Sequence, residues 1–150
     1  MPELPEVEVT LKRVAPELIG ERIKDVSVYW QRTVNAVPVA EFKRTLKGAQ
    51  FKNYQRRGKY LIFELSKRRR TKILAVHLRM SGRLEVLEPG VKRRKHDRVI
   101  ISLKSGSRLA FHDTRKFGRI YLADSIEEIA SGLGLEPLSE EFTSDLLINL

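Results

Sequence analysis

The feature that most constrains the fold is a change of hydrophobic period close to residue 20. Apolar residues recur at helical spacing from Val7 to Leu18, and Gly20 follows as a stop signal. This pattern predicts an amphipathic helix over residues 5–19. The helical period then gives way to short segments of a different kind, so the chain combines one early helix with another class of structure.

Seven short segments rich in β-branched and aromatic residues follow, and turn signals such as SGR, EPG and KSGS separate them. A short helix with a terminal glycine fits AEFKRTLKGA. Many short strands after a single helix predict a mainly β fold with some α structure, namely a two-sheet β-sandwich with the N-terminal helix packed against it. The predicted strands are IKDVSVYW, YLIFEL, KILAVHLRM, GRLEVLE, RVIISLK, RLAFHD and RIYLAD.

The last part of the chain has a third pattern, acidic and without strand periodicity. GLGLEPLSEEF is typical of a linker, and Ser139 or Thr143 could cap a helix that begins just before Leu150. We therefore expect a catalytic β-sandwich domain over residues 1–134. Residues 135–150 are expected to form a linker and the start of a helical domain that continues beyond this chain.

Composition excludes several function classes. The chain has no cysteine, so a disulfide framework, a thiolate metal site and a cysteine nucleophile are excluded. His77, His96 and His112 lack close metal-type spacing, and no metal site is predicted. No apolar run is long enough to span a bilayer, and the early glutamates are unlike a signal peptide. These observations predict a soluble intracellular protein that does not contact a membrane.

Positive charge is concentrated in the middle third of the chain. Residues 51–100 carry 16 Lys/Arg and 4 Asp/Glu, a net charge of +12, whereas the whole chain has a net charge of +10. The charge lies in FKNYQRRGKY, SKRRRTK and VKRRKHDR. A single such run can be a solvated loop, but three in one region favour a polyanionic partner, because neutralised phosphates release condensed counterions.

The opening residues, MPELPEVE, suggest covalent chemistry. Methionine before a small residue is usually removed, which would leave Pro2 as a free secondary amine with a usable neutral fraction at neutral pH. Such an amine can attack a sugar C1′ atom and form an iminium, with Glu3 transferring protons and Glu6 helping to position the site. The alternative is that Pro5 only starts the helix, with the glutamates favourable at its N-terminal end.

Six motifs in order, MPELPEVE, RRGKYLIFEL, HLRMSGRL, KHDRV, FHDTRKFGR and LGLEPLSEEF, resemble the N-terminal domain of formamidopyrimidine-DNA glycosylase. The resemblance covers nearly the whole chain. It implies a DNA repair glycosylase and AP lyase that excises oxidised purines from damaged double-stranded DNA. By the same resemblance, Pro2 is the Schiff-base nucleophile, Glu3 the acid/base partner, Glu6 a supporting carboxylate, and Lys59 a phosphate contact that assists elimination.

The resemblance also assigns DNA contacts. His77 and His96 would contact phosphates beside the lesion, although a histidine on a strand is often only structural. Met80, Arg115 and Phe117 match a triad that fills the gap left by a flipped nucleotide. An apolar wedge and a hydrogen-bonding arginine meet the physical need, because extruding a base leaves a void and an unpaired partner. In the alternative, Met80 and Phe117 are core residues.

Several alternatives and departures stay open at this stage. The chain could be an endonuclease VIII-like glycosylase, although the wedge residues favour the formamidopyrimidine type. It could also be a catalytically idle nucleic-acid-binding module or a basic structural β-protein. Arg79 stands where the family pattern suggests a smaller or neutral residue. The family's helical domain and zinc finger would lie beyond Leu150, so we expect no cofactor in this chain and reduced activity. The resemblance further implies a cytoplasmic monomer, associated with the nucleoid if bacterial.

Overall fold

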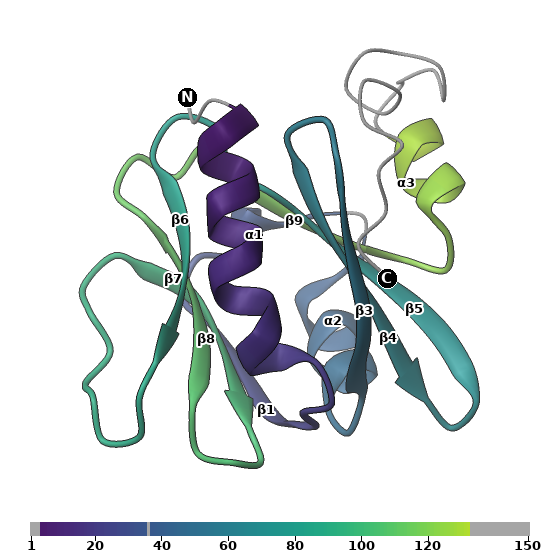
Figure 1. Ribbon diagram of the computed structural model, residues 1–150, viewed down its shortest axis with the longest axis horizontal. Helices are drawn as coiled ribbons and strands as arrows, with labels where there is room; N and C mark the ends of the chain where they lie inside the picture. Colours follow the sequence, from purple (N-terminus) through teal and green to yellow (C-terminus); the bar gives the residue numbers. More distant parts are fainter. Residues whose placement is uncertain (1–3, 36, 133–150) are drawn as a thin grey trace.

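The computed structural model describes residues 4–35 and 37–132 of the chain, which form nine strands, three α-helices and one 3-10 turn (Figure 1). The predicted linker and second domain start at residue 135, outside the described residues. In chain order the elements are α1 (Leu4–Leu18), β1 (Ile23–Val28), η1 (Gln31–Thr33), β2 (Val34–Asn35), α2 (Val39–Leu46), β3 (Gln50–Arg57), β4 (Tyr60–Lys67), β5 (Arg70–His77), β6 (Gly82–Leu87), β7 (Asp97–Leu103), β8 (Arg108–Asp113), β9 (Arg119–Ala123) and α3 (Ile126–Gly132).

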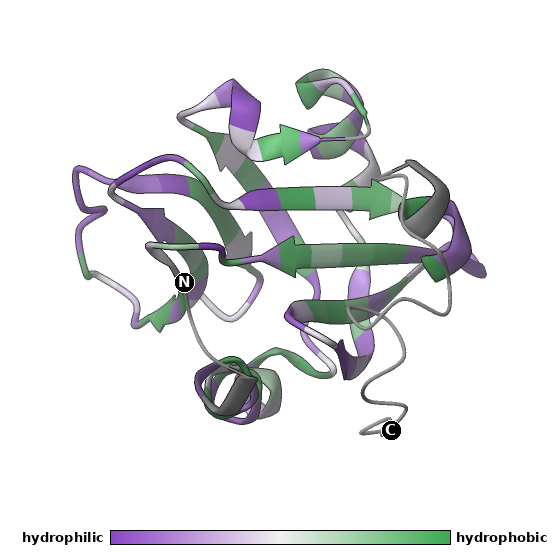
Figure 2. Ribbon diagram, turned by 90° about the horizontal axis from the view of Figure 1, so that it is seen from above, coloured by the Kyte–Doolittle hydropathy of each residue, from purple (hydrophilic) through white to green (hydrophobic). Residues whose placement is uncertain are grey.

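The strands form two sheets, as the sequence predicts. One sheet has four strands in the order β1-β7-β8-β6, and the other has five in the order β2-β9-β5-β4-β3. All pairs are antiparallel except β2 with β9. One hydrophobic cluster includes buried side chains from both sheets and from α1, so the sandwich has a shared core. Figure 2 shows the apolar character of the long strands and the hydrophilic loops around them.

Helix α1 lies at the edge of the sandwich and contacts both sheets through β6, β3 and β4. Its apolar stripe from Val7 to Leu18 is almost fully buried. On one side, the Arg13 guanidinium donates a hydrogen bond of 3.1 Å to the carbonyl of Leu84 on β6. On the other, Arg56 on β3 forms an ion pair of 3.5 Å with Glu8. These contacts fix the helix axis relative to both sheets.

The predicted helix over 5–19 and the predicted short helix are both confirmed, as are all seven predicted strands. Two strands were not predicted. The β3 sequence QFKNYQRR reads as a basic run because its outer face is polar, yet its burial pattern shows an edge strand with Phe51 in the core. Strand β2 has only two residues, too few for a period to register.

The two ends of the five-stranded sheet have different surroundings. Strand β4 runs from Tyr60, near the start of α1, to Lys67, near the end of α2, and seven steps along a strand span about 23 Å. Functional groups at these two ends are therefore well separated.

No helix among residues 4–35 and 37–132 is long and apolar enough to cross a membrane.

Candidate active site

Four segments that are distant in sequence meet at one end of the sandwich, which we call the α1 edge. They are the start of α1, the β3–β4 turn, residues 78–82 and residues 113–118. Figure 1 shows the start of α1 and the β3–β4 turn at this end. Glu6 lines a cleft of about 380 Å³ together with Leu78 and Gly82, which joins the first segment to the third.

A buried carboxylate, Asp113, holds the last two segments together. The Ser81 hydroxyl donates a hydrogen bond to one Asp113 oxygen, which also accepts the Arg115 backbone N–H at 3.2 Å. The other oxygen accepts the Gly118 N–H at 2.6 Å. Ser81 Oγ in turn accepts the Arg115 N–H at 3.2 Å. Hydrogen bonds thus join the loop after β5 to the loop after β8 at their bases.

Gly118 closes this arrangement because nothing larger fits. A Cβ atom at this position would lie 2.3 Å from Phe111 Cζ and 3.0 Å from an Asp113 oxygen. Both neighbours are fully buried and cannot give way without disturbing the core. The glycine of the sequence motif KFG therefore has a steric cause, since only glycine can pack this closely against Phe111 and Asp113.

The three predicted wedge residues lie on these linked loops. Met80 is 52% exposed and Phe117 is 42% exposed, so the alternative that they are core residues is wrong. The Arg115 guanidinium carbon lies 5.2 Å from the centre of the Phe117 ring, a cation–π distance. These side chains present apolar surface to solvent at the end of the sandwich where α1 begins.

Two of the three wedge residues, Met80 and Phe117, follow a residue in the left-handed backbone region. Arg79, with φ 54°, precedes Met80, and Lys116, with φ 63°, precedes Phe117. This conformation is unfavourable for residues with a Cβ atom. It gives a physical reason for expecting a smaller residue at position 79, because this backbone conformation favours glycine, and nothing in the structure explains the arginine side chain. Such outliers concentrate at functional loops.

His77 lies at the base of the same loops, as the last residue of β5. Its ring packs edge-to-face on Tyr60, with centroids 4.5 Å apart. Nδ1 accepts the Arg79 backbone N–H at 3.1 Å, so the neutral ring carries its proton on Nε2. Burial, with the positive charges of Arg79 and Lys59, lowers the pKa of His77 to about 4. At neutral pH this histidine is an uncharged hydrogen-bond donor.

This depressed pKa predicts that folding stability falls in mild acid. As pH drops from 6.5, the usual pKa of histidine, to about 4, His77 takes up a proton in the unfolded state but stays neutral in the folded state. The free energy of unfolding should therefore decrease over this window, by about 3 kcal/mol in total. Urea unfolding at a series of pH values, for the parent and for His77→Gln, measures the effect. Parallel curves for the two proteins would contradict it.

His96 is half-exposed at the start of β7. Its Nδ1 accepts a hydrogen bond of 3.1 Å from the Arg98 guanidinium, and its ring lies edge-to-face with His112 at 6.0 Å. Burial, followed by the charge of Arg98, lowers the pKa of His96. Arg98 also donates to the Asp113 carbonyl at 2.8 Å, so it connects His96 to the β8–β9 loop.

The predicted catalytic residues are only partly described. Glu6 is exposed in the first turns of α1 and faces the cleft, and Lys59 lies in the β3–β4 turn, close enough to His77 to affect its pKa. Pro2 and Glu3 lie outside the described residues, immediately before α1. The site assignments of Pro2, Glu3, Glu6 and Lys59 therefore stay predictions.

Sequence reasoning missed the residues that position the site. Asp113 and Asp97 are fully buried, and both stand inside motifs, FHDTRKFGR and KHDRV, whose histidines and arginine drew attention first. The available signal in the sequence was an aspartate at the end of a predicted strand with histidine or basic residues beside it. Lys116 was missed as well, and its Nζ lies 4.1 Å from the centre of the Trp30 ring. No group of three histidines or carboxylates in the described part of the chain could hold a metal ion.

Comparison with known proteins identifies the relatives of this arrangement. Residues 1–120 match the family model of the formamidopyrimidine-DNA glycosylase N-terminal domain. The chain is 42% identical over 148 residues to the formamidopyrimidine-DNA glycosylase of Protochlamydia amoebophila, covering 97% of this chain and 52% of the relative. It is 41% identical over 151 residues to that of Symbiobacterium thermophilum, covering 98% and 48%. The chain therefore spans about half the length of these curated relatives.

Solved structures give the same result. The Lactococcus lactis Fpg in complex with abasic-site DNA superposes with a TM-score of 0.79 at 30% identity, covering 89% of this chain and 48% of that one. The same protein in complex with a FAPY-dG containing DNA gives a TM-score of 0.78 at 30% identity, covering 88% and 48%. The fold, the ordered motifs and the family model agree, and the chain belongs to the formamidopyrimidine-DNA glycosylase family.

Proposed function

We propose that this chain supplies the catalytic half of a DNA glycosylase and AP lyase that excises oxidised purines, such as 8-oxoguanine and formamidopyrimidines. The observation that carries the proposal is the pair of hydrogen-bonded loops that expose Met80, Arg115 and Phe117 beside the start of α1. The L. lactis neighbours, which are complexes with abasic and FAPY-dG DNA, support the same ligand class.

The proposed chemistry begins at the N-terminus. With Met1 removed, the neutral Pro2 amine forms a bond to C1′ of the damaged nucleoside as the glycosidic bond breaks, and the proton that the amine loses goes to the departing base. Glu3 gives a proton to the ring oxygen as the sugar opens and the iminium forms. Loss of a proton from C2′ then expels the 3′ phosphate by elimination. Amine and carboxylate groups suffice for these steps, so we propose that this chain contributes no cofactor.

The remaining assignments concern the phosphates around the lesion. We propose that Lys59 contacts the backbone and assists elimination, and that Glu6 supports the site from its cleft. His77 contributes as an uncharged donor, because its Nδ1 is occupied and its pKa is low. His96 is more exposed and is held towards the β8–β9 loop by Arg98.

The wedge residues divide the work of base extrusion. Phe117 is an exposed aromatic ring on a loop whose base cannot shift, and such a ring can enter the stack that the extruded nucleotide leaves. Met80 is unbranched and fits an irregular gap. Arg115 can face the acceptor atoms of the unpaired base. A rigid loop base supports this assignment because insertion demands a fixed ring position.

Phe117→Ala should impair excision of a stacked oxidised purine much more than cleavage at an abasic site. Unstacking a base costs a few kcal/mol per step, and an abasic site largely avoids this cost. We expect a loss of about tenfold or more on a duplex with 8-oxoguanine and about threefold or less on abasic DNA. Single-turnover cleavage of both duplexes measures the ratio, with Val91→Ala, another exposed apolar residue, as control. Equal losses on both substrates would contradict the wedge role.

Borohydride trapping tests the proposed function as a whole. The chain is incubated with an abasic or 8-oxoguanine duplex, the iminium is reduced, and the product is analysed by intact-mass spectrometry. We expect a covalent complex on a chain that lacks Met1, and peptide mapping should place the added mass on the N-terminal peptide. A chain that binds DNA but forms no adduct would favour the non-catalytic binding module instead.

We also propose a monomer acting in the cytoplasm, since the curated relatives are bacterial.

A further inference from the structure

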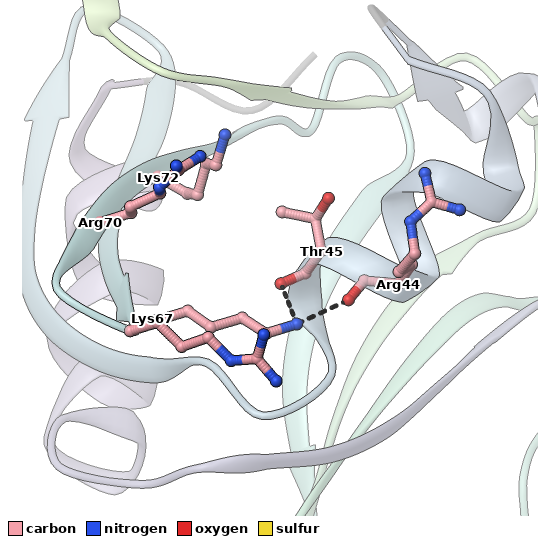
Figure 3. Close-up of a pocket in the computed structure, with 6 residues that line it drawn as sticks. Arg44, Thr45, Lys67, Arg70 and Lys72 are labelled. Carbon is pink, nitrogen blue, oxygen red and sulfur yellow. Dashed lines mark hydrogen bonds between the residues drawn. The ribbon is translucent and has the colours of Figure 1, made fainter.

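A second cationic surface lies at the opposite end of the five-stranded sheet from the α1 edge. It is a groove of about 600 Å³ between the end of α2 and the β4–β5 hairpin, and we call it the distal groove (Figure 3). Five of its six lining residues are cationic and none is acidic. The lining residues are Arg44, Thr45, Lys67, Arg68, Arg70 and Lys72.

Most of this charge has no ion-pair partner among the described residues. Arg44, Arg68 and Arg70 are exposed, and none of them has an ion pair with another residue of the described chain. Lys72 pairs with the exposed Asp124 at the rim. Within the described part of the chain, three guanidinium groups therefore surround the groove without a carboxylate to pair with them.

Lys67 fixes the groove's shape. Its Nζ donates hydrogen bonds to the carbonyls of Arg44, at 2.8 Å, and of Thr45, at 3.4 Å, near the end of α2 (Figure 3). The ammonium thereby satisfies helix carbonyls and ties α2 to β4. Burial, with the charges of Arg68 and Arg44, lowers the pKa of Lys67. The hydrogen bonds of Lys67 therefore fix the positions of α2 and β4, which both contribute cationic side chains to the groove.

The hairpin turn carries arginines where the backbone favours other residues. Arg68 and Arg69 form a two-residue connection, and both have left-handed φ angles, 51° and 68°. Such turns prefer Asn-Gly or Gly-Gly, because a Cβ atom is strained there. The chain thus gives up local stability at a position where it gains two positive charges beside the groove.

We propose that the distal groove binds the phosphate backbone of a second DNA segment while the α1 edge holds the first. This inference rests on the proposed function. Arginine pairs well with phosphate, and no large apolar side chain of the kind that anchors a protein interface lines the groove. The two surfaces lie about 23 Å apart, well beyond the screening length of about 8 Å at physiological salt, so they bind independently.

Two double variants of equal charge test the proposal. Arg68→Asn with Arg69→Gly removes one charge that lines the groove and one charge beside it, and both new residues suit the turn. We therefore expect a higher melting temperature together with weaker DNA binding. Lys24→Gln with Lys104→Gln removes two exposed charges on β1 and the β7–β8 turn as the control. The slope of log affinity against log salt, for an undamaged 12-bp duplex, should fall by about 2 in the groove variant and stay unchanged in the control.

NMR titration of the full 150-residue chain locates the binding. We expect the duplex to shift amides of Thr45 and residues 67–72 as well as those of the α1 edge, and the groove shifts to vanish in the Arg68/Arg69 variant. Shifts confined to the α1 edge would overturn the distal groove and leave the proposed function standing. Inorganic tripolyphosphate is the second probe. If it shifts the groove at concentrations where duplex DNA does not, the site binds a small phosphate compound and the DNA proposal is wrong.

Discussion

Replacing Pro2 with glycine, in a chain from which Met1 is still removed, should eliminate most of the borohydride-trapped complex. Glycine leaves a primary amine on a more flexible backbone, so both the positioning and the iminium chemistry deteriorate. Loss of orientation in a near-attack geometry can cost about 100-fold in rate. Single-turnover trapping on abasic DNA, quantified by intact-mass spectrometry, measures this loss. Binding of undamaged DNA should be unchanged, because the phosphate contacts lie elsewhere.

Pro5→Ala is the matched control for this experiment. Pro5 belongs to the first turn of α1, so its replacement tests the alternative in which the early prolines serve only to start the helix. We expect Pro5→Ala to trap DNA nearly as well as the parent. Equal trapping by the Pro2 variant and the parent would leave the non-catalytic binding module as the better explanation of the charge and the loops.

Asp97→Ala should destabilise the fold by about 3 kcal/mol or more, because it leaves a buried charge network without its acceptor. Asp97 is fully buried and accepts hydrogen bonds from the Arg94 backbone and guanidinium, at 2.8 and 2.9 Å, and from His112 Nδ1 at 2.8 Å. Burial alone would raise the pKa of Asp97, but these hydrogen bonds outweigh burial and lower it. Urea unfolding at neutral pH measures the loss.

The comparison with an exposed carboxylate makes this prediction specific. Asp124→Ala removes the partner of Lys72 at the surface, where an ion pair contributes about 1 kcal/mol or less. Because the folded pKa of Asp97 is depressed, its contribution is present above the usual carboxyl pKa and is lost as pH falls through the folded value. Similar losses for the two aspartate variants would show that the Asp97 network does not stabilise the fold.

The fold was largely predictable because its two periods are clean. The apolar stripe from Val7 to Leu18 is helical, and the central strands read as continuous apolar runs since they are buried on both faces. Strand β3 was not predicted because an edge strand is only partly buried, and its less buried positions include the basic residues Lys52 and Arg57, which also suggest a DNA contact. Composition and periodicity gave conflicting interpretations of the same residues, and the periodicity was the weaker signal.

The candidate site was predictable only where a side chain carries chemistry by itself. Met80, Arg115 and Phe117 were proposed from their motifs, and their exposure is consistent with that role. Ser81 and Asp113 were not proposed, because their importance lies in a contact between positions 32 residues apart. Sequence shows the groups that face a substrate more readily than the buried groups that hold them. Gly118 was equally hard to predict from the sequence, because it matters only through the space that its missing side chain leaves for Phe111.

The contacts of α1 with both sheets set an order of events during synthesis. Helix α1 is made about a hundred residues before β8 and β9, yet the loop between those strands forms the other side of the proposed site. The strand that α1 contacts in one sheet, β6, pairs with β8, and the other sheet is completed by β9. Contacts of such high sequence separation form late in folding. On the proposed chemistry, a ribosome-bound chain therefore exposes the Pro2 amine well before the β8–β9 loop is in place to help direct that amine at DNA.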